Sequence, residues 1–126
     1  MAIQRIVLYP RDIELIQRAF HEHPQKVILD RGAIVGLDTP ETRKEILLKI
    51  QNAPYQERRQ FFSKVKYKTV EMDDVQKLIV GQVLQNYRVY SLLPDADVQS
   101  VDKLKVQILP ALARTYAATA PTHDER

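Results

Sequence analysis

The sequence contains no cysteine, and this absence excludes disulfide bonds and cysteine-ligated zinc sites. Only three glycines occur, at Gly32, Gly36 and Gly81. A phosphate-binding loop needs clustered glycines directly before a helix, so this spacing excludes such a loop. Long apolar runs are also missing: the stretch at residues 6–9 is too short for a signal peptide, and no window approaches a membrane span. We therefore expect a cytoplasmic protein that does not enter a membrane.

Histidine is scarce as well, with His21 and His23 as the only close pair and His123 far along the chain. Two residues apart on a helix, side chains point about 200° away from each other. A metal site needs three or four converging ligands, which this pattern does not supply. The sequence thus predicts neither a metal site nor a bound cofactor.

No catalytic constellation is visible among the remaining polar residues. None of the few serines lies in a nucleophile-elbow pattern. The acidic pairs Asp73-Asp74 and Asp95/Asp97 fall at expected helix starts, where the helix dipole favours negative charge without any catalytic role. We therefore expect a protein that is not an enzyme.

Length and composition predict one domain with a packed core. The chain has 126 residues, of which 44% are hydrophobic and 28% charged, as in an ordinary globular protein. We expect residues 1–116 to form this domain and the small, polar side chains of residues 117–126 to form a frayed tail. The order of elements indicates the α+β class, with a small N-terminal sheet packed by helices and a helical C-terminal half.

The N-terminal elements are expected in the order β-α-β-β. Residues 3–9 are rich in β-branched and aromatic side chains and predict a strand. Residues 11–22 place apolar side chains at helical spacing. Two short apolar runs, 26–30 and 33–37, flank Gly32 and predict a hairpin, because glycine adopts the positive φ that such turns require.

The middle of the chain predicts two helices and an extended segment. Residues 39–51 open with Thr-Pro-Glu, in which threonine caps the helix and proline fits its first position. After a break at residues 52–54, residues 55–65 predict a short helix with its apolar side chains on one face. Residues 66–70 alternate and predict a fourth strand or an extended link.

Two further helices are expected toward the C-terminus. An apolar stripe begins after Asp73 and runs to Tyr90, and the last helix begins near Asp97 and is kinked or split by Pro110. Together these helices carry more apolar surface than one small sheet can cover. The stripes therefore either fill the core or bury themselves against a second copy or another protein.

Charge is the most informative feature of the sequence. Nineteen basic and 16 acidic residues give a net charge of +3. Residues 42–68 alone carry eight basic and two acidic side chains, a net charge of +6, which leaves −3 for the rest. Within them, residues 58–68 interleave basic and aromatic side chains. The candidate binding residues are the basic and aromatic side chains of this region: Arg43, Lys44, Arg58, Arg59, Phe61, Phe62, Lys64, Lys66, Tyr67 and Lys68.

Three interpretations of this basic segment stay open. Its cations could neutralise phosphates while its aromatic rings stack on bases, and two helices around residues 52–54 would suggest a helix-turn-helix led by Arg58 and Arg59. An acidic protein could dock on it instead. Alternatively, the phenylalanines could belong to the core and the lysines to the solvated edge of a strand, where they discourage unwanted pairing.

Three functional hypotheses follow. The first is a non-catalytic interaction or regulatory protein, such as an adaptor, a chaperone-like factor or an assembly subunit, that binds a protein partner or forms a homo-oligomer. The second is a nucleic-acid-binding protein that uses residues 43–68. The third is a small enzyme with a dispersed site drawn from polar residues at element ends: Tyr9, Arg11, His21, Asp30 and Asp38.

Overall fold

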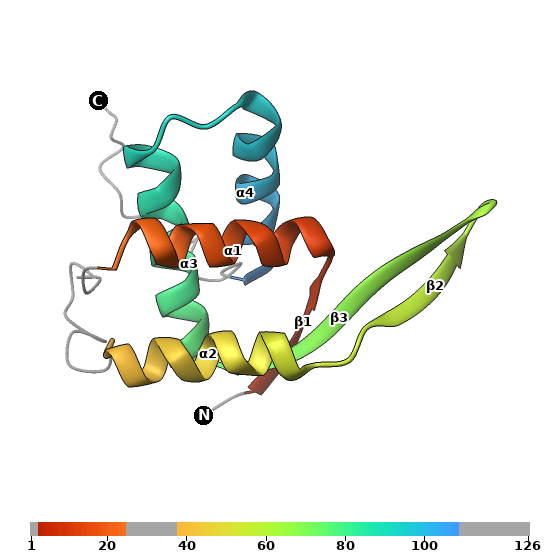
Figure 1. The fold of residues 1–126 in the computed structure, drawn as a ribbon, viewed down its shortest axis with the longest axis horizontal. Helices are drawn as coiled ribbons and strands as arrows, with labels where there is room; N and C mark the ends of the chain where they lie inside the picture. Colours follow the sequence, from red (N-terminus) through yellow and green to blue (C-terminus); the bar gives the residue numbers. More distant parts are fainter. Residues whose placement is uncertain (1–2, 25–37, 109–126) are drawn as a thin grey trace.

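Four helices and a three-stranded antiparallel sheet make up the part of the chain that the computed structural model describes, residues 3–24 and 38–108 (Figure 1). The α+β class expected from the sequence is confirmed. The elements follow in this order: β1 (Ile3–Leu8), α1 (Pro10–Glu22), α2 (Pro40–Asn52), β2 (Gln56–Gln60), β3 (Ser63–Asp73), α3 (Asp74–Tyr90) and α4 (Asp95–Ile108).

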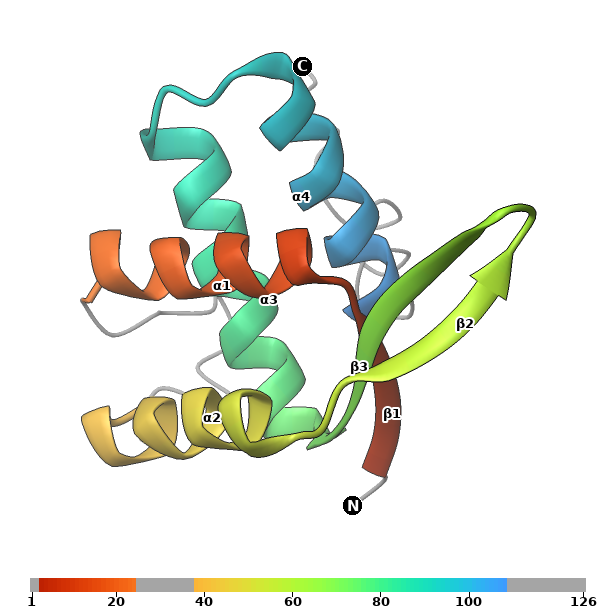
Figure 2. The same ribbon diagram turned by 45° about the vertical axis from the view of Figure 1, so that its right-hand side comes forward.

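The strands are ordered β1-β3-β2, so β3 lies in the middle although it comes last in the sequence. Its two halves have different partners. Residues 68–73 pair with β1, whereas residues 63–67 pair with β2. The second pairing forms a two-stranded ribbon, residues 56–67, that projects away from the helices (Figures 1 and 2). We call this ribbon the arm.

Apolar side chains from the helices and from the inner face of the sheet form one core. Successive side chains of β3 point to opposite faces of the sheet, so Val70 and Met72 are buried while Glu71 between them is exposed. On α1 the expected stripe is buried, as is most of the stripe on α3. Tyr90, at the end of that stripe, is 77% exposed.

Side-chain caps fix the helix starts that the sequence predicts. Thr39 Oγ1 accepts a hydrogen bond of 3.1 Å from the Thr42 backbone N–H at the start of α2, as expected. At the start of α1, Asp12 accepts a bond of 2.9 Å from the Tyr9 backbone N–H. Burial raises the pKa of this Asp12 carboxyl, and the bond from Tyr9 opposes the rise. Helix α4 begins at Asp95, earlier than expected, because the backbone N–H groups of Asp97 and Val98 both donate hydrogen bonds to the Pro94 carbonyl.

The expected helix over residues 55–65 is wrong, because these residues form β2, a tight turn and the start of β3. The helix-turn-helix that depended on it is therefore also wrong. The apolar spacing of Phe61, Phe62 and Val65 imitates a helix face, but lysines alternate with apolar side chains from Lys64 to Lys68, which is the pattern of a strand. The turn contains neither glycine nor asparagine, so it lacks the usual hairpin signal.

Several expectations fall outside the described part of the chain. These are the strands at residues 26–30 and 33–37, the kink at Pro110 and the tail at residues 117–126. Within residues 3–24 and 38–108, no helix has the length and apolar character needed to cross a membrane.

A buried lysine connects the sheet to the end of α2. Lys68 Nζ donates hydrogen bonds to the backbone carbonyls of Ile50, at 2.9 Å, and Gln51, at 3.1 Å, and it lies 4.6 Å from the centre of the Tyr55 ring. The Ile50 carbonyl needs this donor, because the residue four positions later is Pro54, which has no N–H. Lys68 thus caps the C-terminus of α2 from the neighbouring strand.

Replacing this lysine should lower the free energy of unfolding. Lys68→Met leaves the two carbonyls at the end of α2 without their donor, and the expected loss is about 1–3 kcal/mol, measured by urea unfolding. Lys66→Met is the matched control, since Lys66 lies on the same face of β3 but is exposed, and its effect should stay within about 0.5 kcal/mol. Equal effects of the two substitutions would contradict the capping role.

Candidate functional site

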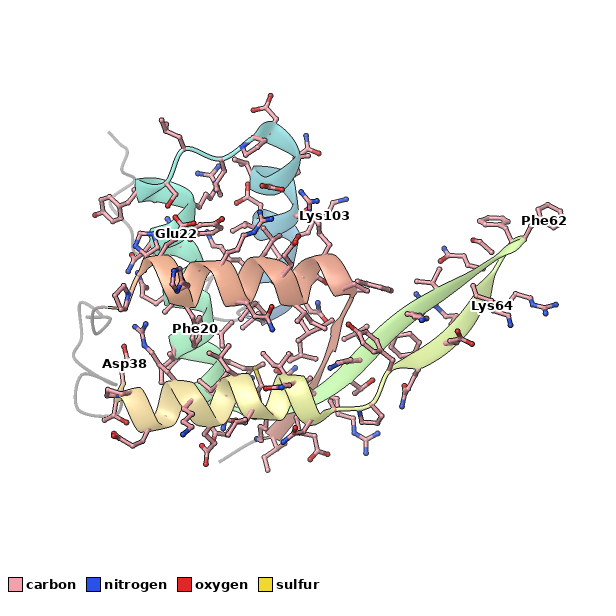
Figure 3. The ribbon with its side chains drawn as sticks, viewed as in Figure 1. Phe20, Glu22, Asp38, Phe62, Lys64 and Lys103 are labelled. Atoms are coloured by element: carbon pink, nitrogen blue, oxygen red, sulfur yellow. The ribbon has the colours of Figure 1, made fainter. Side chains whose placement is uncertain are left out.

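The tip of the arm exposes two phenylalanine side chains. Gln60 pairs with Ser63, which leaves Phe61 and Phe62 as a two-residue loop. Phe61 is 89% exposed and Phe62 is 105% exposed, and Figure 3 shows Phe62 at the far end of the arm. A fully exposed pair of large apolar rings is unusual on a protein surface and marks this tip as a candidate contact.

One face of the arm carries most of its positive charge. The strand register places Arg59 beside Lys64 and Glu57 beside Lys66, with all four side chains exposed. Within the described residues, the side chains of Arg59, Lys64 and Lys66 make no hydrogen bond or ion pair. Two like charges side by side across a strand pair destabilise the pairing. This face therefore presents cations that contribute nothing visible to the fold.

The opposite face of the arm is braced against the body. Arg58 Nη2 donates a 2.6 Å hydrogen bond to Tyr9 Oη, and its guanidinium lies 5.6 Å from the centre of the Tyr67 ring. The rings of Tyr9 and Tyr67 are 6.5 Å apart. Sequence reasoning missed this role of Tyr9, because the contact depends on the register of β3 with both of its neighbours. Arg58 and Tyr67 thus help to hold the arm in place.

The arm accounts for the whole net charge of the chain. Four basic side chains and Glu57 give residues 56–67 a net charge of +3, which equals the net charge of all 126 residues. The rest of the chain is therefore neutral overall. A positive potential that is concentrated on a projecting element favours an anionic partner at that element.

Three other candidate residues lie away from the arm. Arg43 is buried and forms a two-pronged ion pair with Asp38, at 2.8 and 2.9 Å, and it also bonds the His23 carbonyl at 2.7 Å. Lys68 is buried against the end of α2. Lys44 is exposed on α2, eight residues before that helix ends near the base of the arm. None of these three side chains contributes to the exposed surface of the arm.

Of the residues considered for a dispersed enzymatic site, His21 and Asp38 line one hollow between α1 and α2, whereas Tyr9 and Arg11 lie at the other end of α1. Arg11 lies at the start of α1 and bonds Asp97, whereas His21 lies near the end of that helix, about 15 Å away by helical rise. Asp38 is engaged by Arg43, and Asp30 lies outside the described residues. No group of three or more potential metal ligands occurs in the described ranges.

Two open hollows flank α2. One of about 600 Å³ runs along Lys44 and Leu48, and another of about 750 Å³ lies between α1 and α2 beside Phe20. Two described groups have shifted pKa values: burial raises the pKa of Asp12, and burial lowers the pKa of Lys105. Neither group lines either hollow. These two shifts therefore do not point to either hollow.

Comparison with known proteins adds no further constraint. No protein-family model, curated protein or solved structure matches this chain significantly.

The backbone at the tip is strained. Phe61 has a φ of 57°, the only positive φ at a non-glycine residue in the described ranges. When the first residue of a two-residue hairpin loop has a positive φ, glycine is the preferred residue. A bulky side chain at that position lowers stability. Strained backbone of this kind tends to persist at sites of function.

Glycine at Phe61 should stabilise the arm, whereas glycine at Phe62 should not. Phe61→Gly removes a conformational penalty of about 1–2 kcal/mol against an entropic cost of about 0.5–1 kcal/mol. Amide exchange in the arm should therefore slow by up to about fivefold, as measured by nuclear magnetic resonance. Phe62→Gly adds only the entropic cost and should accelerate exchange. If both substitutions change exchange in the same direction, the φ of Phe61 is not the source of the strain.

Proposed function

We propose that this chain is a nucleic-acid-binding protein that contacts its ligand with the arm. The observation that supports it is the combination of exposed cations and exposed aromatic rings on one projecting ribbon, residues 56–67, of an otherwise neutral chain. Cationic side chains neutralise phosphates and release counterions, which supplies most of the affinity for nucleic acid. Two-stranded ribbons are also known to contact duplexes in either groove. The role is non-catalytic and regulatory, and the location is cytoplasmic.

Solubility alone explains this surface less well. Lysines on an edge strand do discourage aggregation. However, a ribbon selected only for solubility would not expose Phe61 and Phe62 at its tip, since exposed apolar rings favour association. Nor would it place Arg59 beside Lys64, because alternating charges keep a ribbon soluble without repulsion across the strands. A polyanionic ligand explains both features.

Reversing the charge of one cross-strand pair tests the proposal. Arg59→Glu with Lys64→Glu keeps a like-charged pair, so the arm should fold as before, while affinity for a fluorescein-labelled duplex in 50 mM salt should fall by about 100-fold. The pair is preferred to Arg58, because Arg58 also braces the arm against Tyr9. Fluorescence anisotropy measures the affinity.

The matched control changes the net charge equally elsewhere. Arg18→Glu with Lys103→Glu alters exposed side chains on α1 and α4, and affinity should stay within about threefold of the original protein, because surface charges beyond a Debye length are screened. For the original protein, three phosphate contacts predict a fall in affinity of about 40-fold between 50 and 200 mM salt. Equal losses in both double variants, or no binding by the original protein, would refute the arm as a nucleic-acid interface.

A second candidate function is docking of a protein or of another copy of this chain. Val89 is 54% exposed, Tyr90 77% and Leu92 104%, which leaves a run of apolar side chains uncovered at the end of α3. Such a run is typical of a contact between chains.

Sedimentation velocity tests this second candidate. Association through the end of α3 predicts a species heavier than the 14.6 kDa monomer at micromolar concentration, and Tyr90→Ser with Leu92→Ser should restore the monomer. Leu48→Ser, which changes an exposed apolar side chain on α2, should leave association unchanged. A single species of 14.6 kDa for the original protein, with no co-purifying partner, would exclude this candidate.

A further inference from the structure

Phe61 and Phe62 form the end of the arm, beyond its cations. We propose that these two rings act as a wedge that enters between neighbouring base pairs of a duplex and bends it. This inference rests on the proposed nucleic-acid-binding function and gives the tip a role separate from that of the cations. Apolar side chains are known to unstack base steps in this way when they insert from the minor groove.

The length of the arm fits this task. A strand rises about 3.3 Å per residue, so Phe62 lies about 16 Å beyond Tyr67 at the base of the arm. The minor groove is about 7.5 Å deep. The tip can therefore reach the base edges while the helices stay outside the groove.

The cations are placed at the height of the phosphates. Lys64 lies two residues behind Phe62, about 7 Å by strand rise, and Arg59 lies beside it in the register. When the tip touches the floor of a groove about 7.5 Å deep, both cations are level with its rim, where the phosphates run. The same geometry thus accounts for the exposed like-charged pair and for the exposed rings.

The conformation of the tip also favours a wedge. The side chain of Phe61 is 89% exposed, although its backbone φ of 57° is one that glycine would adopt without strain. Within the described residues, neither ring packs against another aromatic ring or a cation. The rings are therefore available to a ligand without any rearrangement of the fold.

A duplex explains the arrangement better than a single strand does. Single-strand binding proteins stack successive bases on aromatic side chains spread along a basic groove. Here the third aromatic ring of the arm, Tyr67, contacts Arg58 and Tyr9, and the two exposed rings belong to adjacent residues of one turn rather than being spread along the ribbon. A turn of this kind can separate two stacked base pairs but offers no path for a strand.

Bending of a labelled duplex tests the wedge. A 30-base-pair duplex carries donor and acceptor dyes at its ends and a central TA step, which unstacks easily. The original protein should bend it by about 20–90°, seen as increased energy transfer. Phe61→Gly with Phe62→Ser should still bind at 50 mM salt through the unchanged cations but should lose the bend. Thermal unfolding confirms that this variant is folded.

The possible outcomes separate the wedge from the proposed function. Binding with bending that is lost in the tip variant supports the wedge. Binding without bending by the original protein, equal bending by the tip variant, or binding to single strands alone overturns the wedge and leaves nucleic-acid binding in place. Failure of the original protein to bind any nucleic acid overturns both the wedge and the proposed function.

Discussion

The pairing of β3 with two different strands is the constraint on which the rest of the structure depends. Over residues 68–73 the strand is part of the body, with β1 alongside and the helices over its buried face. Over residues 63–67 it has only β2 as a neighbour and leaves the body. An isolated hairpin is marginally stable in water, so the arm depends on being continuous with the anchored half of the same strand.

Lys68 lies where the strand passes from arm to body. Its side chain points to the core face, yet its ammonium group ends on the carbonyls at the C-terminus of α2, where the negative end of the helix dipole favours a cation. On the other face, the contact of Arg58 with Tyr9 joins the arm to the start of α1. The direction of the arm is therefore supported by polar contacts at two helix ends, together with the contact between the rings of Tyr9 and Tyr67.

The sequence predicts the helical part of this fold well because its signals are local. The Thr39 cap, the proline that follows it and the apolar stripes of α1 and α3 are all visible within a few turns of helix. It also marks the segment in which the positive charge of the arm is concentrated, since charge composition does not depend on the fold. The sequence does not predict the arm, because the turn at Phe61 lacks glycine and because the hydrogen bond from Arg58 to Tyr9 depends on the register of strands that are distant in the sequence.

The helix expected over residues 55–65 is wrong because the hairpin that forms there lacks the usual local signals of a hairpin. A hairpin selected for stability alone would carry glycine or asparagine at its turn and alternating charges along its strands, and both features would be readable in the sequence. This arm has Phe61 in a strained conformation and Arg59 beside Lys64, two local losses of stability within three residues of its tip. Departures from local preference tend to occur at functional sites, and these two departures therefore support the proposal that the arm binds a ligand.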